Sequence, residues 1–279
     1  MMVSPYDDSR LLVVLQIDHS RVAGLLAAHW GNAEFAEPRP YTSVVLAAQE
    51  HDSGWWDWEI KPTLDERGEP IDYFGRDGMG VPRDIHCAFD RHGIDRVAEQ
   101  DPYAGLLVSM HLSGLNNQGF GVVTHMPNRM HLPTVAEFMR DQEQLRAQLL
   151  ARLRQSPAFA EVSTDEHVWV NYKLMEAFDR LAQFICNRYP LNSTARRGGP
   201  PNVLHDIPVA PGKQDTTITV DVQDEKRAIV RPYPFDVDVL EVPIPARLVP
   251  RRSYPSQEEF LRDYYKAPRT TMNYSLHAA

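Results

Sequence analysis

A histidine and an aspartate, His51 and Asp52, stand side by side in the stretch QEHDSGWW. They follow the apolar run VVLAAQ, which predicts a buried helix whose last turn carries His51 on its buried face. A buried carboxylate beside a buried imidazole needs hydrogen-bonding partners or a metal ion. Two interpretations stay open: both residues are metal ligands and Gly54 turns the chain sharply away from the ion, or His51 caps the helix and Asp52 opens a turn.

A second aspartate, Asp179, lies in the middle of the predicted helix KLMEAFDRLAQFIC. Its helical neighbours are mostly apolar, namely Tyr172, Met175, Ala182 and Cys186. An aspartate on such a face is costly unless a metal ion or a cationic side chain compensates its charge. Asp179 is therefore a candidate ligand, and a salt bridge to an arginine of another helix is the alternative.

Two further histidines occupy comparable positions. His111 shares a predicted helix face with Leu107, Val108 and Leu115, and His19 lies in the first turn of a helix predicted directly after an apolar strand. A single histidine on an apolar face is often a hydrogen-bonded core residue, and this alternative stays open for His111. Together, four predicted helices place nitrogen or oxygen donors on their core sides: His19, His51, Asp52, His111 and Asp179.

This donor set contains three imidazoles and two carboxylates. Such a mixture suits Zn²⁺, Mn²⁺ or Fe²⁺ better than Ca²⁺, which prefers oxygen ligands alone. We therefore expect a divalent transition metal as cofactor, with one ion favoured over two. The two cysteines, Cys87 and Cys186, are too few for a cysteine-rich zinc site and do not indicate a disulfide framework.

The elements that must position these donors are mainly helices. Asp18 is a predicted cap of the first helix, Thr42 or Ser43 of the second, and Thr164 or Asp165 of the long helix that carries Asp179. The predicted helices cover residues 18–30, 42–52, 82–92, 101–115, 133–154, 164–187 and 256–266. Residues 57–83 and 116–131 are predicted loops, and 191–215 a polar link.

The period of the apolar pattern changes after residue 215, where TTITVDV alternates and AIVRPYPFDVDVLEVPIPARLVP combines β-branched residues with prolines. These segments predict a small antiparallel sheet, which we expect the N-terminal strand at 11–17 to join. The predicted fold class is thus mainly α, a helical bundle with a small antiparallel sheet. We expect a helical metal-binding domain over residues 1–195 and a β-rich region over 196–279 packed on it.

Composition narrows the possible partners. The net charge of −9 and the lack of a long basic run argue against binding of nucleic acid. The N-terminal segment does not resemble a signal peptide, and no run approaches the 18 or so apolar residues of a membrane span. We therefore expect a cytoplasmic protein that acts on a small molecule and binds no membrane; its oligomeric state is not predicted.

The order His…His-Asp…Asp on buried helices resembles the HD-domain superfamily. Its members are all-helical metal-dependent enzymes, chiefly phosphohydrolases of nucleotides and phosphoesters. In this resemblance His19 corresponds to the first histidine, His51 and Asp52 to the doublet, and Asp179 to the final aspartate. The distance along the chain from His19 to His51 is somewhat long for the superfamily.

Superfamily members with two metals insert two more histidines between the doublet and the final aspartate. His111 resembles the second of these, and His86, which lies 25 residues earlier, is the candidate for the first. His86 departs from the pattern because its segment, PRDIHCAFDRHG, is polar. More narrowly, the segments QIDHS, EHDSGWWDWE, LLVSMH, FDRLAQFIC and RPYPF look like those of a bacterial family of unknown function within or near this superfamily.

The resemblance implies a hydrolase that uses metal-activated water on a phosphorylated small molecule. Asp52 would be a ligand that also orients the water, and His111, if not a ligand, would protonate the leaving group. Cationic candidates for the phosphate are Lys61, Arg76, Arg83, Arg129 and Arg180. Three tryptophans either line a substrate pocket or pack the loop down: Trp55, Trp56 and Trp58.

Two alternatives use the same residues differently. A di-iron oxygenase, similar to inositol oxygenase, would need His86 to complete six ligands. A non-enzymatic sensor would keep the site for binding a metal or ligand without turnover.

Overall fold

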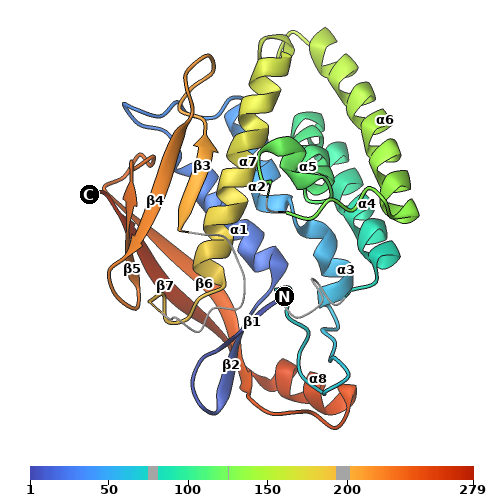
Figure 1. Ribbon diagram of the computed structural model, residues 1–279, viewed down its shortest axis with the longest axis vertical. Helices are drawn as coiled ribbons and strands as arrows, with labels where there is room; N and C mark the ends of the chain where they lie inside the picture. Colours follow the sequence, from blue (N-terminus) through green and yellow to red (C-terminus); the bar gives the residue numbers. More distant parts are fainter. Residues whose placement is uncertain (75–80, 125, 193–201) are drawn as a thin grey trace.

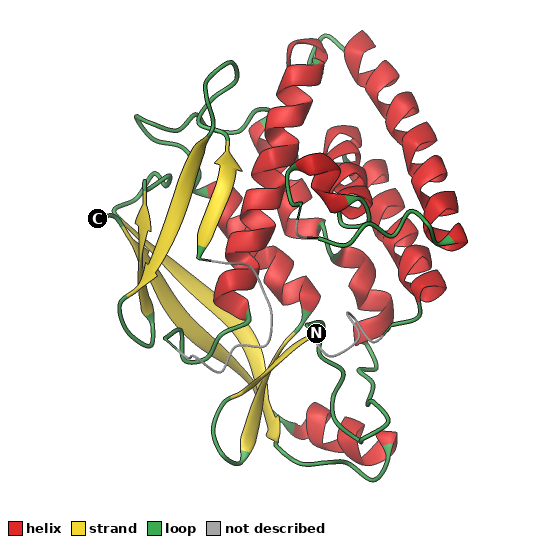
Figure 2. Cartoon of the chain, viewed as in Figure 1, coloured by secondary structure: helices red, strands yellow, loops and turns green. Residues whose placement is uncertain are grey.

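A computed structural model of the protein describes residues 1–74, 81–124, 126–192 and 202–279. A group of helices lies beside a curled sheet, and the long helix α7 (Asp165–Cys186) runs between them (Figures 1 and 2). Helix α1 (Gln16–Ala28) contacts both α7 and the sheet strand β6, while α7 also contacts β3. Two of the helices that carry candidate ligands, α1 and α7, therefore lie against the sheet.

The sheet has seven strands in the order β1-β2-β6-β7-β5-β4-β3. Neighbouring strands are antiparallel except β5 and β7, which pair in parallel. Their bounds are β1 Met2–Pro5, β2 Arg10–Val14, β3 Val203–Ile207, β4 Thr216–Val222, β5 Arg227–Arg231, β6 Val239–Pro250 and β7 Arg269–His277. The N-terminal strands thus pair with strands from the far end of the chain.

The longest strand, β6, shows how the sequence specifies this sheet. Alternate residues from Leu240 to Ala246 are buried, as the period of a strand with one covered face requires. Pro243 and Pro245 point the other way and pair only with β7, because β2 reaches β6 no further than Arg247. The two prolines, which lack an N–H, therefore stand where β6 has a neighbour on one side only.

The predicted fold class, a mainly helical bundle with a small antiparallel sheet, is wrong. The sheet is large and mixed, and three of its strands lie outside the predicted strands: β1, β3 and β7. These strands are not recognisable from the sequence pattern, because β1 has four residues, β3 lies in the predicted polar link, and β7 buries only Tyr274 and Leu276. The division into residues 1–195 and 196–279 stays a prediction, and strands from both sides of it share this sheet.

The remaining helices are α2 Tyr41–Glu50, α3 Trp56–Glu59, α4 Arg83–Gln100, α5 Pro102–Gly114, α6 Pro133–Gln155 and α8 Gln257–Lys266. Short 3-10 helices cover η1 Ser53–Trp55, η2 Gln118–Gly121 and η3 Ala160–Val162. Thr164 is confirmed as a cap, because its side chain accepts the N–H of His167. None of the helices in the described part of the chain has the length and apolar character that a membrane crossing requires.

The caps predicted for the first two helices differ from those in the structure. Helix α1 begins at Gln16, so Asp18 lies inside its first turn, where it pairs with Arg21 and Arg269. The strand before α1 ends correspondingly early, at Val14. Helix α2 begins at Tyr41 after Pro40, and its Ser43 hydroxyl instead donates a hydrogen bond to Asp101.

Candidate metal centre

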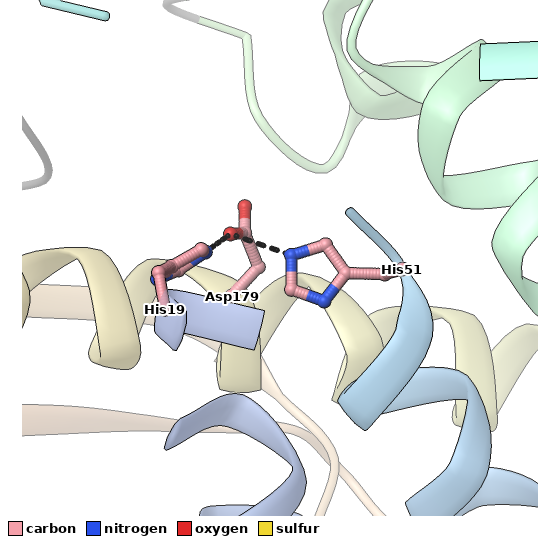
Figure 3. Close-up of side chains that lie close together, drawn as sticks. All are labelled: His19, His51 and Asp179. Atoms are coloured by element: carbon pink, nitrogen blue, oxygen red, sulfur yellow. Dashed lines mark hydrogen bonds and ion pairs between the residues drawn. The ribbon is translucent and has the colours of Figure 1, made fainter. Parts of the chain in front are cut away.

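Three helices bring two histidines and an aspartate together in the interior. His19 comes from the first turn of α1, His51 from the C-terminal end of α2, and Asp179 from the middle of α7 (Figure 3). One donor atom of each lies within 4.8 Å of the others, and all three side chains are buried. This cluster could hold a metal ion.

The distances within the cluster are close to those between ligands of one ion. Oδ1 of Asp179 lies 2.8 Å from Nε2 of His19 and 3.3 Å from Nε2 of His51. Oδ2 of Asp52 lies 3.5 Å from Nε2 of His51 and 3.8 Å from Nε2 of His19. Two ligands about 2.1 Å from a metal are about 3.0 Å apart at a right angle and about 3.4 Å apart at a tetrahedral angle.

The hydrogen bond of His51 fixes how its ring faces the cluster. Nδ1 of His51 lies 2.8 Å from the carbonyl oxygen of Ala48, which can only accept, so Nδ1 carries a proton. Nε2 then turns toward the oxygens of Asp52 and Asp179 and makes no hydrogen bond within the described residues. Either a second proton on Nε2 or a metal cation must therefore lie between that nitrogen and the carboxylates. Histidines that bind a metal through one ring nitrogen are commonly held, as His51 is, by a hydrogen bond from the other ring nitrogen.

His111 extends the cluster from α5. Its Nδ1 lies 2.8 Å from Oε1 of Glu176, and its Nε2 lies 3.8 Å from Oδ2 of Asp179. The rings of His51 and His111 stand edge to face with their centroids 5.0 Å apart. His111 is therefore held by a buried carboxylate and aimed at the same aspartate as His19 and His51.

Two residues of α7 support the cluster and were missed from the sequence. Glu176 holds His111, and Gln183 donates from Nε2 to both carboxylate oxygens of Asp179 at 2.9 Å. They lie three residues before and four residues after Asp179, so all three share one face of the helix. That spacing was the available signal, because it places three polar residues on one stripe of a buried helix.

The electrostatics agree with a site built for a cation. Burial raises the pKa of Asp179, but His19 and His51 lower it by more, so that its pKa lies well below the ordinary value. Burial lowers the pKa of His51, but Asp52 and Asp179 raise it to well above the ordinary value. Without a metal, the buried carboxylates therefore retain a proton on the imidazole of His51.

Burial and neighbouring charges also act in opposite directions on the pKa values of Asp52 and His111, which flank the cluster. Burial raises the pKa of Asp52, and the nearby His51 and His19 lower it by more. Burial lowers the pKa of His111, and the charge and hydrogen bond of Glu176 raise it by more. Asp52 and His111 thus belong electrostatically to the cluster, although neither is among the three donors that lie within 4.8 Å of one another.

His86 lies apart from these donors. It is on α4, where its Nδ1 is 3.1 Å from Oδ2 of Asp90, and its ring packs against Trp55 and Phe89. No contact recorded for the described residues joins His86 to His19, His51 or Asp179. Its role as a metal ligand stays a prediction.

The predicted substrate-binding residues lie in different surroundings. Trp55 is buried against Tyr73, His86 and Phe89, so it packs the core of this region. Trp56 is about half exposed and Lys61 is exposed.

The arginines differ in their contacts. Arg180 donates to the carbonyl oxygens of Glu176 and His205 and so joins α7 to β3. Arg129 donates to the carbonyl oxygen of Leu115. Arg76 lies outside the described residues.

Gly54 has a different role from the predicted sharp turn. Its φ is not among the positive values, and a Cβ at this position would lie 2.3 Å from the carbonyl oxygen of Phe89. On α4, a Cβ at Gly93 would lie 2.7 Å from the amide nitrogen of Gly54. The glycine pair therefore lets η1, which directly follows Asp52, pack backbone to backbone against α4.

A protein-family model described as "Protein of unknown function (DUF3891)" matches residues 1–251. The matched residues contain all the donors of the cluster and every strand except β7. The chain belongs to this family. Membership agrees with the narrower resemblance seen in the sequence and provides no support for the HD-domain superfamily. No curated protein and no solved structure matches the chain.

Proposed function

We propose that the protein is a metal-dependent hydrolase of phosphoesters or nucleotides. The observation that carries this proposal is the buried cluster of His19, His51 and Asp179, with Asp52 beside it. A mixed set of imidazole and carboxylate ligands supports Mn²⁺, Zn²⁺ or Fe²⁺, and three close donors support one ion. The order of these residues along the chain, which resembles that of the HD-domain superfamily, also supports the proposal.

The ion would supply Lewis acidity and lower the pKa of a water toward about 7. Asp52 is the residue placed to accept a hydrogen bond from that water, because its Oδ2 faces both histidines and its side chain has no other ion-pair partner in the described part of the chain. His111 retains a proton through its bond to Glu176, so it is the candidate donor to a leaving group.

An anionic substrate is supported by Arg129. It is partly buried and has no carboxylate partner among residues 1–74, 81–124, 126–192 and 202–279. Burial lowers the pKa of Arg129 and the charge of Arg83 lowers it further, so the two guanidinium groups are within electrostatic range of each other. Tyr73 lies within electrostatic range of Arg129 as well as of Asp52 and Asp179. Two arginines for which the described ranges offer no acidic partner suit a phosphate.

The test is metal quantitation on the purified protein, followed by a panel of phosphomonoesters and nucleotides assayed for phosphate release. We expect about one Mn, Zn or Fe per chain, and hydrolysis that Asp52→Ala abolishes while the fold persists. Two irons per chain with oxygen uptake would establish the oxygenase instead. A stoichiometric metal without turnover on the panel would favour the sensor. Protein that binds no metal, and whose melting temperature no divalent metal shifts, would overturn the metal centre itself.

A further inference from the structure

A hollow open to solvent lies on another part of the molecule, between α3, α8 and the strands β2, β6 and β7. The empty space within it, open solvent included, is ≈ 540 Å³. Figure 1 shows the surrounding elements, with α8 below α3 and to the right of β2 in this view. Sites for small molecules commonly combine apolar walls with a few convergent polar groups.

The rim of this hollow is unusually apolar for a surface. Trp56, Ile60 and Tyr265 line it, and their side chains are 51%, 52% and 54% exposed. They are three of the eight large apolar residues that the described part of the chain exposes. Single exposed apolar residues need no explanation, but a tryptophan, an isoleucine and a tyrosine gathered around one depression indicate a binding surface.

The two carboxylates of the hollow already have partners. Asp18 is buried and pairs with Arg269 at 2.5 Å and with Arg21 at 3.1 Å. Glu59 is buried and accepts the backbone N–H of Gln16 through both oxygens, at 3.0 and 2.9 Å. Neither carboxylate is therefore available as the main contact of a cationic ligand.

The two arginines of the hollow have donors to spare. Arg247 donates from Nη1 to the carbonyl oxygen of Ala267, and its guanidinium lies 5.1 Å from the centre of the Tyr264 ring. Arg269 uses Nη2 for Asp18, while half of its side chain is exposed. A guanidinium carries five N–H groups, so these contacts engage only part of each arginine. Arginine N–H pairs suit a planar carboxylate.

We propose that this hollow binds a planar aromatic carboxylate, with its ring against Trp56 and Tyr265 and its carboxylate toward Arg247 and Arg269. The aromatic rim provides faces on which a ring stacks, and the arginines provide the charge that orients it. The hollow contains none of the donors of the metal cluster. The site therefore stands independently of the hydrolase proposal.

Binding is tested by titration calorimetry of the full chain with 2-naphthoate, and with two comparators that each lack one feature. 2-Naphthamide keeps the rings without the charge, and cyclohexanecarboxylate keeps the charge without the rings. We expect 2-naphthoate to bind with a dissociation constant below about 1 mM, and each comparator at least about tenfold more weakly. The absence of binding below that concentration, or equal binding of the amide, would overturn the proposal.

Variants locate the bound molecule. Trp56→Ala and Tyr265→Ala are expected to weaken 2-naphthoate at least about tenfold, and Arg247→Gln to weaken 2-naphthoate without changing the affinity for the amide. Trp169→Ala removes another exposed tryptophan, on α7, and Arg262→Gln removes an exposed arginine from α8; both should leave binding unchanged. Trp56 and Tyr265 are half exposed, so at least one of their variants should fold. Unchanged affinity in a folded Trp56→Ala or Tyr265→Ala protein would place the ligand elsewhere and refute the assignment.

Discussion

Oδ1 of Asp179 lies 2.8 Å from Nε2 of His19, although 160 residues separate them along the chain. The contact exists because α1 and α7 pack against each other and both lie on the sheet. His51 reaches the same oxygen from α2 at 3.3 Å. Three helices far apart in sequence therefore meet at one carboxylate, and the metal centre depends on the packing of the whole helical layer.

Asp179→Asn is expected to abolish metal binding and to destabilise the metal-free protein. Removing the charge leaves the protonated His51 without its closest buried counter-ion, and breaking a buried pair in this way costs about 3 kcal/mol. The measurements are metal content by mass spectrometry and the free energy of unfolding in urea. Asp141→Asn is the matched control, because Asp141 lies on a helix but pairs with Arg91 at the surface, where it should affect neither quantity. Retention of stoichiometric metal by Asp179→Asn would remove Asp179 from the ligand set.

Glu176→Gln is expected to lower metal affinity by about tenfold to a hundredfold while the fold is kept. The amide has the size of the carboxylate but no charge. It therefore holds the imidazole of His111 less firmly and raises the pKa of His111 less than the carboxylate does. Affinity is measured by competition with a chelator of known strength. Glu166→Gln changes an acid in the first turn of the same helix and serves as the control. An affinity equal in Glu176→Gln and Glu166→Gln would show that His111 is not coupled to the metal.

The stability of the protein freed of metal should fall as the pH rises above about 6.5, the ordinary pKa of histidine. The pKa values of His51 and His111 are higher in the folded state than in the unfolded state. Their contribution to stability is therefore fully present below the unfolded-state pKa and is lost as the pH rises through the folded-state pKa. Asp179 behaves in the opposite way: its lowered pKa contributes stability above pH 3.8, which is lost as the pH falls through the folded pKa.

Urea unfolding of chelator-treated protein from pH 6 to 9 measures this slope. The metal-loaded protein is the internal control, because a metal must displace the proton from His51 and therefore binds more tightly as the pH rises. The difference in unfolding free energy between the loaded and metal-free forms should widen with pH. A constant difference over this range would mean that metal binding displaces no proton from these histidines.

The candidate ligands could be recognised from the sequence because they are polar residues on predicted helix faces that are otherwise apolar. An aspartate at position 179 and a histidine at 19 stand on helix faces that are otherwise apolar, which is rare unless something compensates them. The structure brings these residues and His51 within 4.8 Å. The supporting pair, Glu176 and Gln183, was missed because a polar residue on a long helix is assigned to the surface by default. Only the direction of α7 relative to the sheet shows that its whole face is covered.

Most of the sheet could not be predicted, because it too depends on contacts between distant parts of the chain. Strand pairing between β2 and β6 joins residues such as Leu12 and Leu248, and no local pattern encodes so distant a partner. β7 has mostly polar residues because one of its faces is open, so its sequence lacks the apolar period of a buried strand. Helix caps such as Thr164 were predictable, since their hydrogen bonds are made within three residues.

Gly54→Ala is expected to destabilise the protein by about 1–3 kcal/mol and to weaken metal binding, although Gly54 contacts no donor atom. A methyl group at this position would lie 2.3 Å from the carbonyl oxygen of Phe89, so η1 and α4 must separate. Because η1 begins directly after Asp52, the separation shifts the Asp52 carboxylate away from His19 and His51. Ser53→Ala is the control: it alters the adjacent residue and removes a buried hydroxyl that has no hydrogen-bond partner among the described residues, so it should be nearly neutral. Urea unfolding and chelator competition on both variants separate the two effects. If Gly54→Ala loses stability but keeps wild-type metal affinity, Asp52 does not contribute to the metal site.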